Sequence, residues 1–323
     1  MRIIYFGSSS FGLPCLQAIH HSDHELVGVF TQPARPAGRH RSHLTPTDVA
    51  QWCQANQVDC IEAKNINAPD MAAKIAACEA DLLVVIAFGQ KISQDVIALQ
   101  RHRAVNVHAS LLPKYRGAAP IHWAIMNGET ETGVSIITLA DEMDAGEVLA
   151  QGATAVEPED TFESMHEKLS QLSVPVLMET IGRIQNGTAT YTPQDPAKVT
   201  YAPKLKKADG YIDWNKSADD IVNHIRGLRP WPGAQSMYVS SETGRHWRVG
   251  LVSATAVERK DANGITGQLD TDLSVICGDG ALRINKIKPA GSHRMDFEAF
   301  VNGHQCRPGD LFISAEKAMS GIF

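Results

Sequence analysis

The hydrophobic pattern changes along the chain and divides it into two parts. In the first part, short apolar runs rich in β-branched residues recur, and helically spaced stretches such as residues 14–20 and 47–54 separate the early ones. The runs are RIIYFG, ELVGVFTQ, DLLVVIAFG, AVNVHAS and TGVSIITL. Strands that alternate with helices are typical of a mostly parallel sheet covered on both faces. We therefore predict a doubly wound, Rossmann-like α/β domain over residues 1–188.

A long helix closes this first part. Asp160-Thr161-Phe162-Glu163 has the form of a capping box, and apolar residues follow at helical spacing towards Asn186-Gly187. Residues 189–208 are rich in Thr, Pro and Lys without a helical period, which predicts a linker. From residue 209 to 323, short alternating runs are broken by Gly, Asp and Asn, with one helix near residues 217–228. This texture predicts a small antiparallel barrel or sandwich, and we expect a β-barrel of the OB-like type.

Composition narrows the class of protein. With 323 residues and 43% hydrophobic positions, the chain can build two cores, and its net charge of −6 argues against non-specific coating of nucleic acid. An RNA partner would need a local basic patch. The start MRIIYFG lacks signal-peptide features, and no apolar run reaches the roughly 18 residues of a membrane span. The six cysteines form no C-x-x-C pair and no spacing typical of zinc, and we expect reduced, partly buried thiols. We expect a cytoplasmic monomer without a membrane or metal partner.

Candidate chemistry lies at the end of one predicted strand, in VNVHASLLPKYRG. Alternate strand residues face the same side, so Asn106 and His108 should project together. An Asn-x-His pair at a strand end is more often a structural feature than a functional one. Here, however, the pair stands at the carboxyl end of a strand, which is the place where open α/β sheets bind ligands. That position favours a functional site.

A cluster of carboxylates follows the next predicted strand, in DEMDAGEVL, and includes Asp141, Glu142 and Asp144. A carboxylate near His108 would orient the imidazole and stabilise its charged form. Asn106 could then donate to a developing oxyanion while His108 transfers a proton or stabilises charge. This set suits attack by an amine on an acyl carbon. The first turn, FGSSSFGLP, lacks both G-x-G-x-x-G and a P-loop, which disfavours dinucleotide or nucleoside triphosphate chemistry.

These motifs resemble one known family. Asn106-x-His108, the following SLLPKYRGAAPIHWAIMNGETETGVSI and then MDAGEVL are similar to the signature of the folate-dependent formyltransferases. VGVFTQPARPAGR and VTYAPKLKKADGYIDW resemble the tRNA-acting members, so the resemblance covers nearly the whole chain. It implies formyl transfer from 10-formyltetrahydrofolate to the α-amino group of methionine on initiator tRNA, in translation initiation. The implied catalytic residues are Asn106, His108 and Asp144.

The resemblance also implies where the two substrates bind, with no metal required. The folate pterin would enter a pocket formed by Phe88, Gly89, Gln90, Ile92, Ser110, Leu111, Leu112, Pro113, Leu139 and Asp141. The tRNA phosphates suit Arg side chains and Lys charges. The residues expected to bind them are Arg35, Arg39, Arg41, Lys204, Lys206 and Lys207. The second domain is expected to hold the acceptor stem of the tRNA.

Two other classes of function share parts of this pattern. A formyltransferase or formyl-folate hydrolase acting on a small molecule, such as an amino-sugar nucleotide or glycinamide ribonucleotide, would use the same catalytic set. A protein that binds RNA without catalysing a reaction could have the same fold without using the catalytic residues. The second domain and the tRNA-type motifs favour the tRNA substrate, and the complete set of three polar side chains favours an enzyme.

Overall fold

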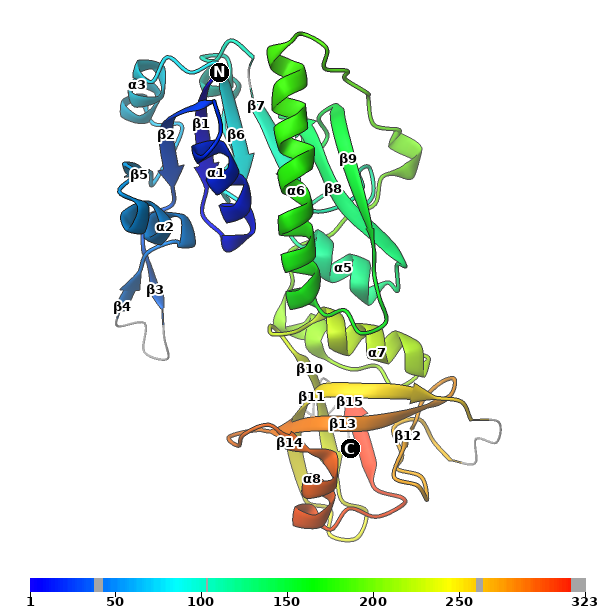
Figure 1. Cartoon of the computed structure of the whole chain (residues 1–323). Helices are drawn as coiled ribbons and strands as arrows, with labels where there is room; N and C mark the ends of the chain where they lie inside the picture. The colour runs from blue at the N-terminus through cyan, green and yellow to red at the C-terminus, as the bar shows by residue number, and fades with distance from the viewer. Residues whose placement is uncertain (38–42, 103, 260–263, 315–323) are drawn as a thin grey trace. The chain divides into compact units, whose positions relative to one another are not determined.

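The computed structural model describes residues 1–37, 43–102, 104–259 and 264–314, which form two compact units (Figure 1). Unit 1 comprises Met1–Pro120, Glu131–Ala155 and His166–Ala202. Unit 2 comprises Ile121–Thr130, Val156–Met165 and Pro203–Phe323. Within the described ranges, no helix combines the length and apolar character needed to cross a bilayer.

Unit 1 is built on a seven-stranded sheet. In spatial order its strands are β5 (Cys60–Glu62), β2 (Glu25–Thr31), β1 (Arg2–Gly7), β6 (Leu82–Ile86), β7 (Ala104–His108), β8 (Glu131–Thr138) and β9 (Val148–Ala155). The first five are parallel, whereas β8 runs antiparallel to β7, and β9 to β8. The predicted mostly parallel sheet is therefore confirmed. A separate hairpin joins β3 (Arg35–Ala37) to β4 (His43–Thr45).

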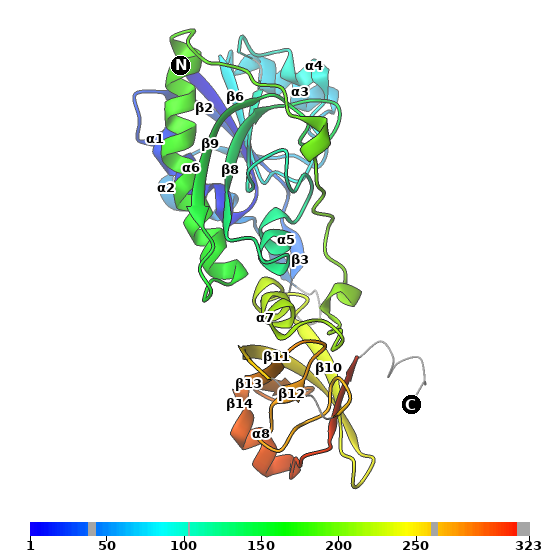
Figure 2. The same ribbon diagram turned by 90° about the vertical axis from the view of Figure 1, so that its right-hand side faces the viewer.

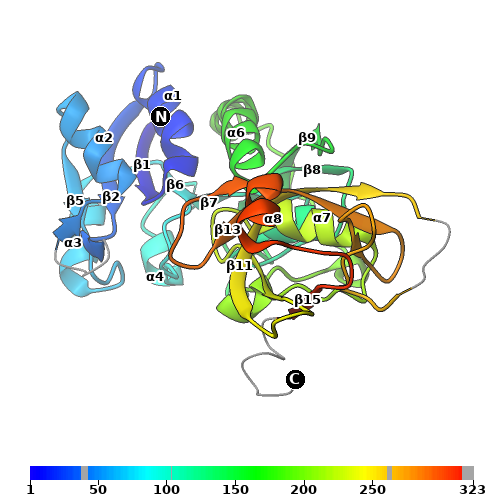
Figure 3. The same cartoon turned by 90° about the horizontal axis from the view of Figure 1, so that it is seen from below.

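Helices cover both faces of this sheet (Figures 2 and 3). On one side lie α1 (Leu13–His20), α2 (Asp48–Asn56) and the long α6 (Phe162–Gln185), and on the other lie α3 (Pro69–Ala77) and α4 (Gln94–Ile97). Strand alternation explains the double covering, because Ile4 and Phe6 of β1 pack in the same core cluster as Met71 of α3 and Val96 of α4. A 3₁₀ turn, η1 (Ser10–Gly12), precedes α1.

The capping box of α6 lies one residue later than predicted. The Thr161 Oγ1 accepts a hydrogen bond from the Ser164 amide at 3.4 Å, and the Ser164 Oγ accepts one from the Thr161 amide at 3.0 Å. Asp160 is occupied elsewhere, since its carboxylate accepts from the Glu157 amide and from the Ser164 hydroxyl, each at 2.8 Å. Reciprocal capping therefore uses Ser164 in place of the predicted Glu163.

Residues 189–202, within the range predicted as a linker, belong to unit 1. Thr192 exchanges two backbone hydrogen bonds with Val148 of β9, at 2.8 and 2.9 Å. Farther along, the Thr200 carbonyl accepts from the Arg116 amide at 2.9 Å, and the Ala202 amide donates to the Arg116 carbonyl at 2.7 Å. The short η2 (Pro196–Lys198) lies between these attachments. This stretch is thus bonded to the body of unit 1 near both of its ends.

Unit 2 contains a six-stranded antiparallel sheet that nearly closes into a barrel, as predicted. Its order is β12 (Val275–Ile276), β13 (Ala281–Pro289), β11 (His246–Val257), β10 (Ala234–Val239) and β15 (Leu311–Ser314), with β14 (Met295–Asp296) on β13. Bridges from Gln268 to Leu311 and from Leu269 to Val275 connect the two edge strands. The helical elements are α5 (Pro120–Met126), η3 (Lys207–Gly210), α7 (Ala218–Gly227) and α8 (Phe297–His304). Only α7 had been predicted, and Ser217 caps it by accepting from the Asp220 amide at 3.1 Å.

Candidate active site

Strand β7 presents Asn106 and His108 on one face. It pairs with β6 in parallel and with β8 in antiparallel register, so its backbone is fixed on both sides. Val105 and Val107 alternate with the two polar residues and are buried. His108 is itself only 6% exposed, so this imidazole requires polar partners within the protein.

Both ring nitrogens of His108 face hydrogen-bond acceptors. The Nε2 lies 2.9 Å from the Tyr115 carbonyl oxygen, and the Nδ1 lies 3.5 Å from the Asp144 Oδ2. The Tyr115 carbonyl oxygen can only accept, so the Nε2 donates this hydrogen bond, and the Nδ1 then faces the Asp144 carboxylate at ion-pair distance. The structure therefore brings together the histidine and the carboxylate that the sequence singled out from two separate strand ends.

Asp144 is held in a tight loop between β8 and β9. Its φ of +56° is left-handed, and its Oδ2 also accepts a hydrogen bond from the Gly117 amide at 2.9 Å. Two residues later, Gly146 allows the chain to approach its own strand closely. A Cβ at this position would lie 1.7 Å from the Thr138 carbonyl oxygen, so only glycine fits there.

Asn106 is the third predicted catalytic residue. It is partly buried, and its backbone is paired in the sheet with Ile137 of β8. Across the described part of the chain, its side-chain amide makes no hydrogen bond to another residue. The amide N–H groups are consequently available to an acceptor on a substrate, as an oxyanion-stabilising group requires.

The turn after β7 is fixed by two residues that the sequence analysis did not identify. Ser135 of β8 accepts from the Leu112 amide at 3.0 Å and donates to the Ser110 carbonyl at 2.7 Å. Gln151 of β9 donates to the Leu112 carbonyl at 2.9 Å and to the Ser135 hydroxyl at 2.8 Å. Ser135 lies within the signature segment quoted above, but nothing in the sequence distinguishes either residue from other polar positions of a strand.

The predicted pterin-binding segment uses its side chains within the protein. Phe88 and Ile92 belong to the core beside Phe6, and the Phe88 and Phe6 ring centroids are 5.2 Å apart. The Gln90 side chain accepts from the Ile66 amide at 2.9 Å and donates to the Ala63 carbonyl at 2.8 Å. A ligand at this segment would thus meet mainly backbone groups.

A cavity of about 500 Å³ lies beside β7 and β8 in unit 1. This size is in the range of small-molecule sites. Leu139 is the one predicted pterin-binding residue in its lining, and the exposed Asp141 lies two residues farther along the same loop. The cavity is lined by Ile97, Arg101, His102, Ala104, Val105, Thr138, Leu139, Glu147, Ile184 and Tyr191.

The predicted tRNA-binding residues lie on both units. Arg35 is exposed at the start of β3, whereas Arg39 and Arg41 fall outside the described residues. Lys204, Lys206 and Lys207 are exposed at the start of the last segment of unit 2. Their ammonium groups are therefore open to solvent and to a phosphate ligand.

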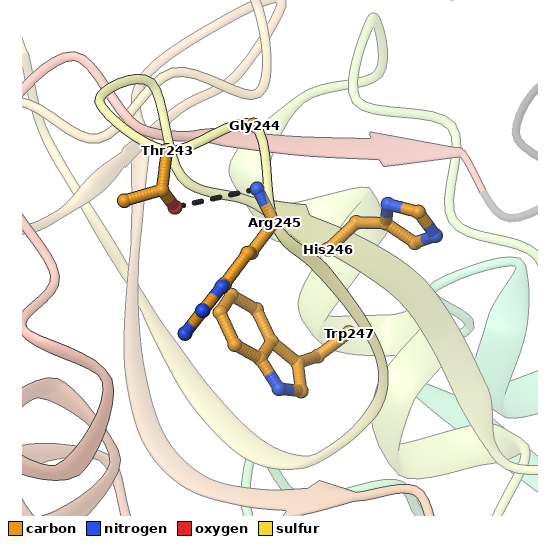
Figure 4. Close-up of a pocket in the computed structure, with 5 residues that line it drawn as sticks. All are labelled: Thr243, Gly244, Arg245, His246 and Trp247. Atoms are coloured by element: carbon orange, nitrogen blue, oxygen red, sulfur yellow. Dashed lines mark hydrogen bonds between the residues drawn. The ribbon is translucent and has the colours of Figure 1, made fainter.

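A shallow pocket on unit 2 contains further basic and aromatic residues that the sequence analysis did not single out (Figure 4). It is formed by residues 243–247, at the turn into β11, where the Arg245 amide donates to Thr243 Oγ1 at 3.3 Å. Figure 4 shows Arg245 and Trp247 on the same side of the hairpin and His246 directed away from them.

An amide, an imidazole and a carboxylate stand together at the edge of an open α/β sheet, and this set of groups suits acyl transfer. In the described ranges, no group of three or more His, Cys, Asp or Glu side chains is arranged to bind a metal.

Comparison with family models agrees with an acyl-transfer site: "Formyl transferase" matches residues 1–181, and "Formyl transferase, C-terminal domain" matches residues 204–305. The chain belongs to the formyltransferase family.

Individual relatives match over nearly the full length of the chain. Proteins named methionyl-tRNA formyltransferase from Trichlorobacter lovleyi and Geobacter metallireducens are 38% and 36% identical to it, over 98% and 96% of this chain. The matches cover 98% and 97% of those relatives. These matches confirm the family resemblance predicted from the sequence.

Among solved structures, the chain resembles WlaRD, a sugar 3N-formyl transferase determined in the presence of dTDP and 5-N-formyl-THF. The TM-score is 0.65 at 15% identity, covering 91% of this chain and 99% of that one. At this identity the likeness shows the fold alone.

Proposed function

We propose that this chain transfers the formyl group of 10-formyltetrahydrofolate to the α-amino group of methionine esterified to initiator tRNA, in translation initiation in the cytoplasm. The proposal rests on one observation above all. His108 and Asp144, which come from two separate strand ends, lie 3.5 Å apart, and Asn106 shares a strand face with the histidine. The full-length relatives that carry the name methionyl-tRNA formyltransferase support the choice of acceptor.

The reaction needs no nucleophile from the protein. The free amine of the methionyl group attacks the formyl carbon directly, and the carbonyl oxygen of the resulting tetrahedral intermediate takes up negative charge. Asn106 donates an amide hydrogen bond to that oxygen, and protonated His108 supplies positive charge beside it. The carbon–N10 bond then breaks, N10 accepts a proton and the amine loses one. Asp144 holds the imidazole in orientation throughout.

The folate donor suits features of unit 1. A flat heterocycle with amide-like edges suits backbone donors and acceptors flanked by apolar side chains, such as the backbone beside Phe88 and Ile92. The structural neighbour that was determined with 5-N-formyl-THF supports a folate ligand. We propose that the pterin meets the backbone of residues 88–92, the turn 110–113 and the loop from Leu139 to Asp141.

The tRNA acceptor suits exposed basic residues. Arg35 of unit 1 and Lys204, Lys206 and Lys207 of unit 2 are exposed and can therefore pair with phosphates. We propose that unit 1 performs the chemistry and that unit 2 holds the acceptor stem. The resemblance to a sugar 3N-formyl transferase leaves an amino-sugar nucleotide as the competing acceptor.

One assay separates these acceptors. The purified protein is incubated with 10-formyltetrahydrofolate and either methionyl-tRNA or an amino-sugar nucleotide, and formyl-methionine is measured after mild hydrolysis of the ester. Formyl-methionine from the tRNA reaction alone is the expected result. Transfer only to the sugar, or hydrolysis of the folate without transfer, would overturn the proposal.

Substitution tests the catalytic roles. We expect Asn106→Ala and His108→Ala each to lower kcat by about 100- to 1000-fold with little change in KM, because each removes a group that acts on the transition state. Asn56→Ala on the exposed end of α2 is the matched control and should retain full kcat. Rates within threefold of the wild type in either active-site variant would contradict the assigned roles.

A further inference from the structure

A buried arginine and a glutamine form a hydrogen-bonded clamp against the loop that carries Asp144. The Arg116 side chain is 9% exposed, and its Nε and Nη2 donate to Gln194 Oε1 at 3.0 and 2.9 Å. Gln194 Nε2 in turn donates to the carbonyl oxygens of Asp144 and Gly146, each at 2.7 Å. The chain from guanidinium to amide to backbone is thus continuous, and every link has good hydrogen-bond length.

We propose that Gln194 is a positioning residue for Asp144 and that Arg116 is its anchor. This inference rests on the proposed function and names residues that act behind the catalytic set. Gln194 fixes the carbonyl groups on both sides of residue 145, so it determines how the loop backbone is oriented. That orientation matters because Asp144 adopts a left-handed φ of +56°, which a non-glycine residue holds only when its surroundings enforce it.

The charge of Arg116 strengthens this clamp. A glutamine oxygen that accepts two hydrogen bonds from a guanidinium is polarised, and its N–H groups become better donors. Glu142 also approaches Arg116, with its Oε1 3.3 Å from Nη1, but its side chain is 66% exposed and solvent screens the pair. The amide of Gln194 is therefore the principal partner of the buried charge.

The three consecutive residues 115–117 make contacts that hold the side chains of His108 and Asp144. The Tyr115 carbonyl accepts from His108 Nε2, the Gly117 amide donates to Asp144 Oδ2, and the Arg116 guanidinium reaches Asp144 through Gln194. The same turn therefore sets the imidazole and both ends of the aspartate. A displacement of Gln194 would change the distance between His108 and Asp144 without touching either side chain.

The test must separate positioning of Asp144 from simple pairing of a buried charge. Gln194→Glu keeps the oxygen that accepts from Arg116 but cannot donate to the two carbonyl groups. We expect it to retain the thermal stability of the wild type and to lose about 10- to 100-fold in kcat, with KM for both substrates within about twofold. Gln194→Met, which removes both functions, should lose kcat similarly and also lose stability. Gln54→Glu, an exposed change of equal charge on α2, is the control.

A second measurement, by NMR, tests the role of Gln194 without any substrate. The ring ¹⁵N and ¹H signals of His108, assigned with His108→Gln, should shift in Gln194→Glu in the same direction as in Asp144→Asn. An unchanged His108 signal, or wild-type kcat in Gln194→Glu, would overturn the positioning role. Absence of formyl transfer in the wild type would instead reject the proposed function. The NMR signals of His108 would then still test whether Gln194 positions Asp144.

Discussion

Backbone conformation at single residues brings the candidate catalytic groups together. Tyr115 and Asp144 have φ values of +64° and +56°, and Ala87, just before the predicted pterin segment, has +47°. Such conformations are unfavourable for side chains with a Cβ and tend to gather at functional sites. In this molecule two of them aim a carbonyl and a carboxylate at the same imidazole, so the strain is directly linked to the site.

Gly146 is the residue on which this loop depends most strictly. We expect Gly146→Ala to lower kcat at least about tenfold, because the added Cβ would lie 1.7 Å from the Thr138 carbonyl and the loop with Asp144 must move away. The stability should fall by about 1–3 kcal/mol. Steady-state rates and thermal unfolding measure both effects. Gly182→Ala on α6, whose added Cβ meets nothing within 4 Å, is the control and should be neutral or stabilising.

At this scale the sequence identifies some functional residues and misses others for a physical reason. Asn106 and His108 could be found because a strand of period two puts them on one face, and Asp144 because it follows the next predicted strand. Gln194 lies 50 positions beyond Asp144, in a stretch without periodicity, and its role exists only through tertiary hydrogen bonds. Ser135 and Gln151 lie in strands, but their roles likewise exist only through tertiary hydrogen bonds.

At the scale of elements, long periodic segments were predicted well and short ones were not. The strands β1, β2, β6, β7 and β8 and the helices α6 and α7 follow clear hydrophobic patterns. The elements α4, with four residues, and β12 and β14, with two each, are too short to show a period and form because their neighbours hold them. The reversal of direction at β8 also leaves no local signal, since a strand reads alike in either direction.

Helix α7 contains a titratable group that should make unit 2 sensitive to acid. Burial, together with the nearby charge of Lys216, lowers the pKa of His224 to about 4, and the His224 Nε2 is buried without a hydrogen-bond partner in the described chain. Because the ordinary pKa of 6.5 applies in the unfolded chain, protonation favours unfolding. Stability is therefore full above about pH 6.5 and falls as the pH drops towards 4.

We expect the free energy of unfolding of unit 2 to decrease by at most about 3 kcal/mol across this window, and His224→Gln to remove most of that decrease. Urea unfolding at several pH values, followed by tryptophan fluorescence, measures it. Four of the five tryptophans, at positions 123, 214, 231 and 247, lie in unit 2, so the signal reports mainly on that unit. Parallel pH curves for the two proteins would reject this role for His224.

For the whole molecule, net charge and local charge act in opposite directions. The chain carries a net charge of −6, which repels a polyanion at long range, while exposed lysines offer a local attraction. Productive tRNA binding must then depend on a few close phosphate contacts. Such contacts release counterions, so the affinity falls as salt rises.

We expect KM for methionyl-tRNA to rise steeply with KCl concentration, while kcat stays nearly constant. Replacing Lys204, Lys206 and Lys207 by alanine together should raise KM and reduce the slope of log KM against log salt by about one for each phosphate that is no longer neutralised. Lys74→Ala on α3, an exposed lysine outside the proposed binding set, should leave the slope unchanged. An identical slope in the triple variant would remove these lysines from the tRNA site.

The hydrogen bonds of residues 189–202 limit where homologues of this protein can gain or lose residues. A true tether between domains tolerates insertions and deletions, because loop length affects stability only weakly. This stretch is bonded to β9 through Thr192, to Arg116 through Gln194 and to the turn after β7 through Thr200 and Ala202. Adding or removing a residue between these attachments would shift Gln194 out of reach of its partners, so homologues that exchange their second unit should do so beyond Ala202.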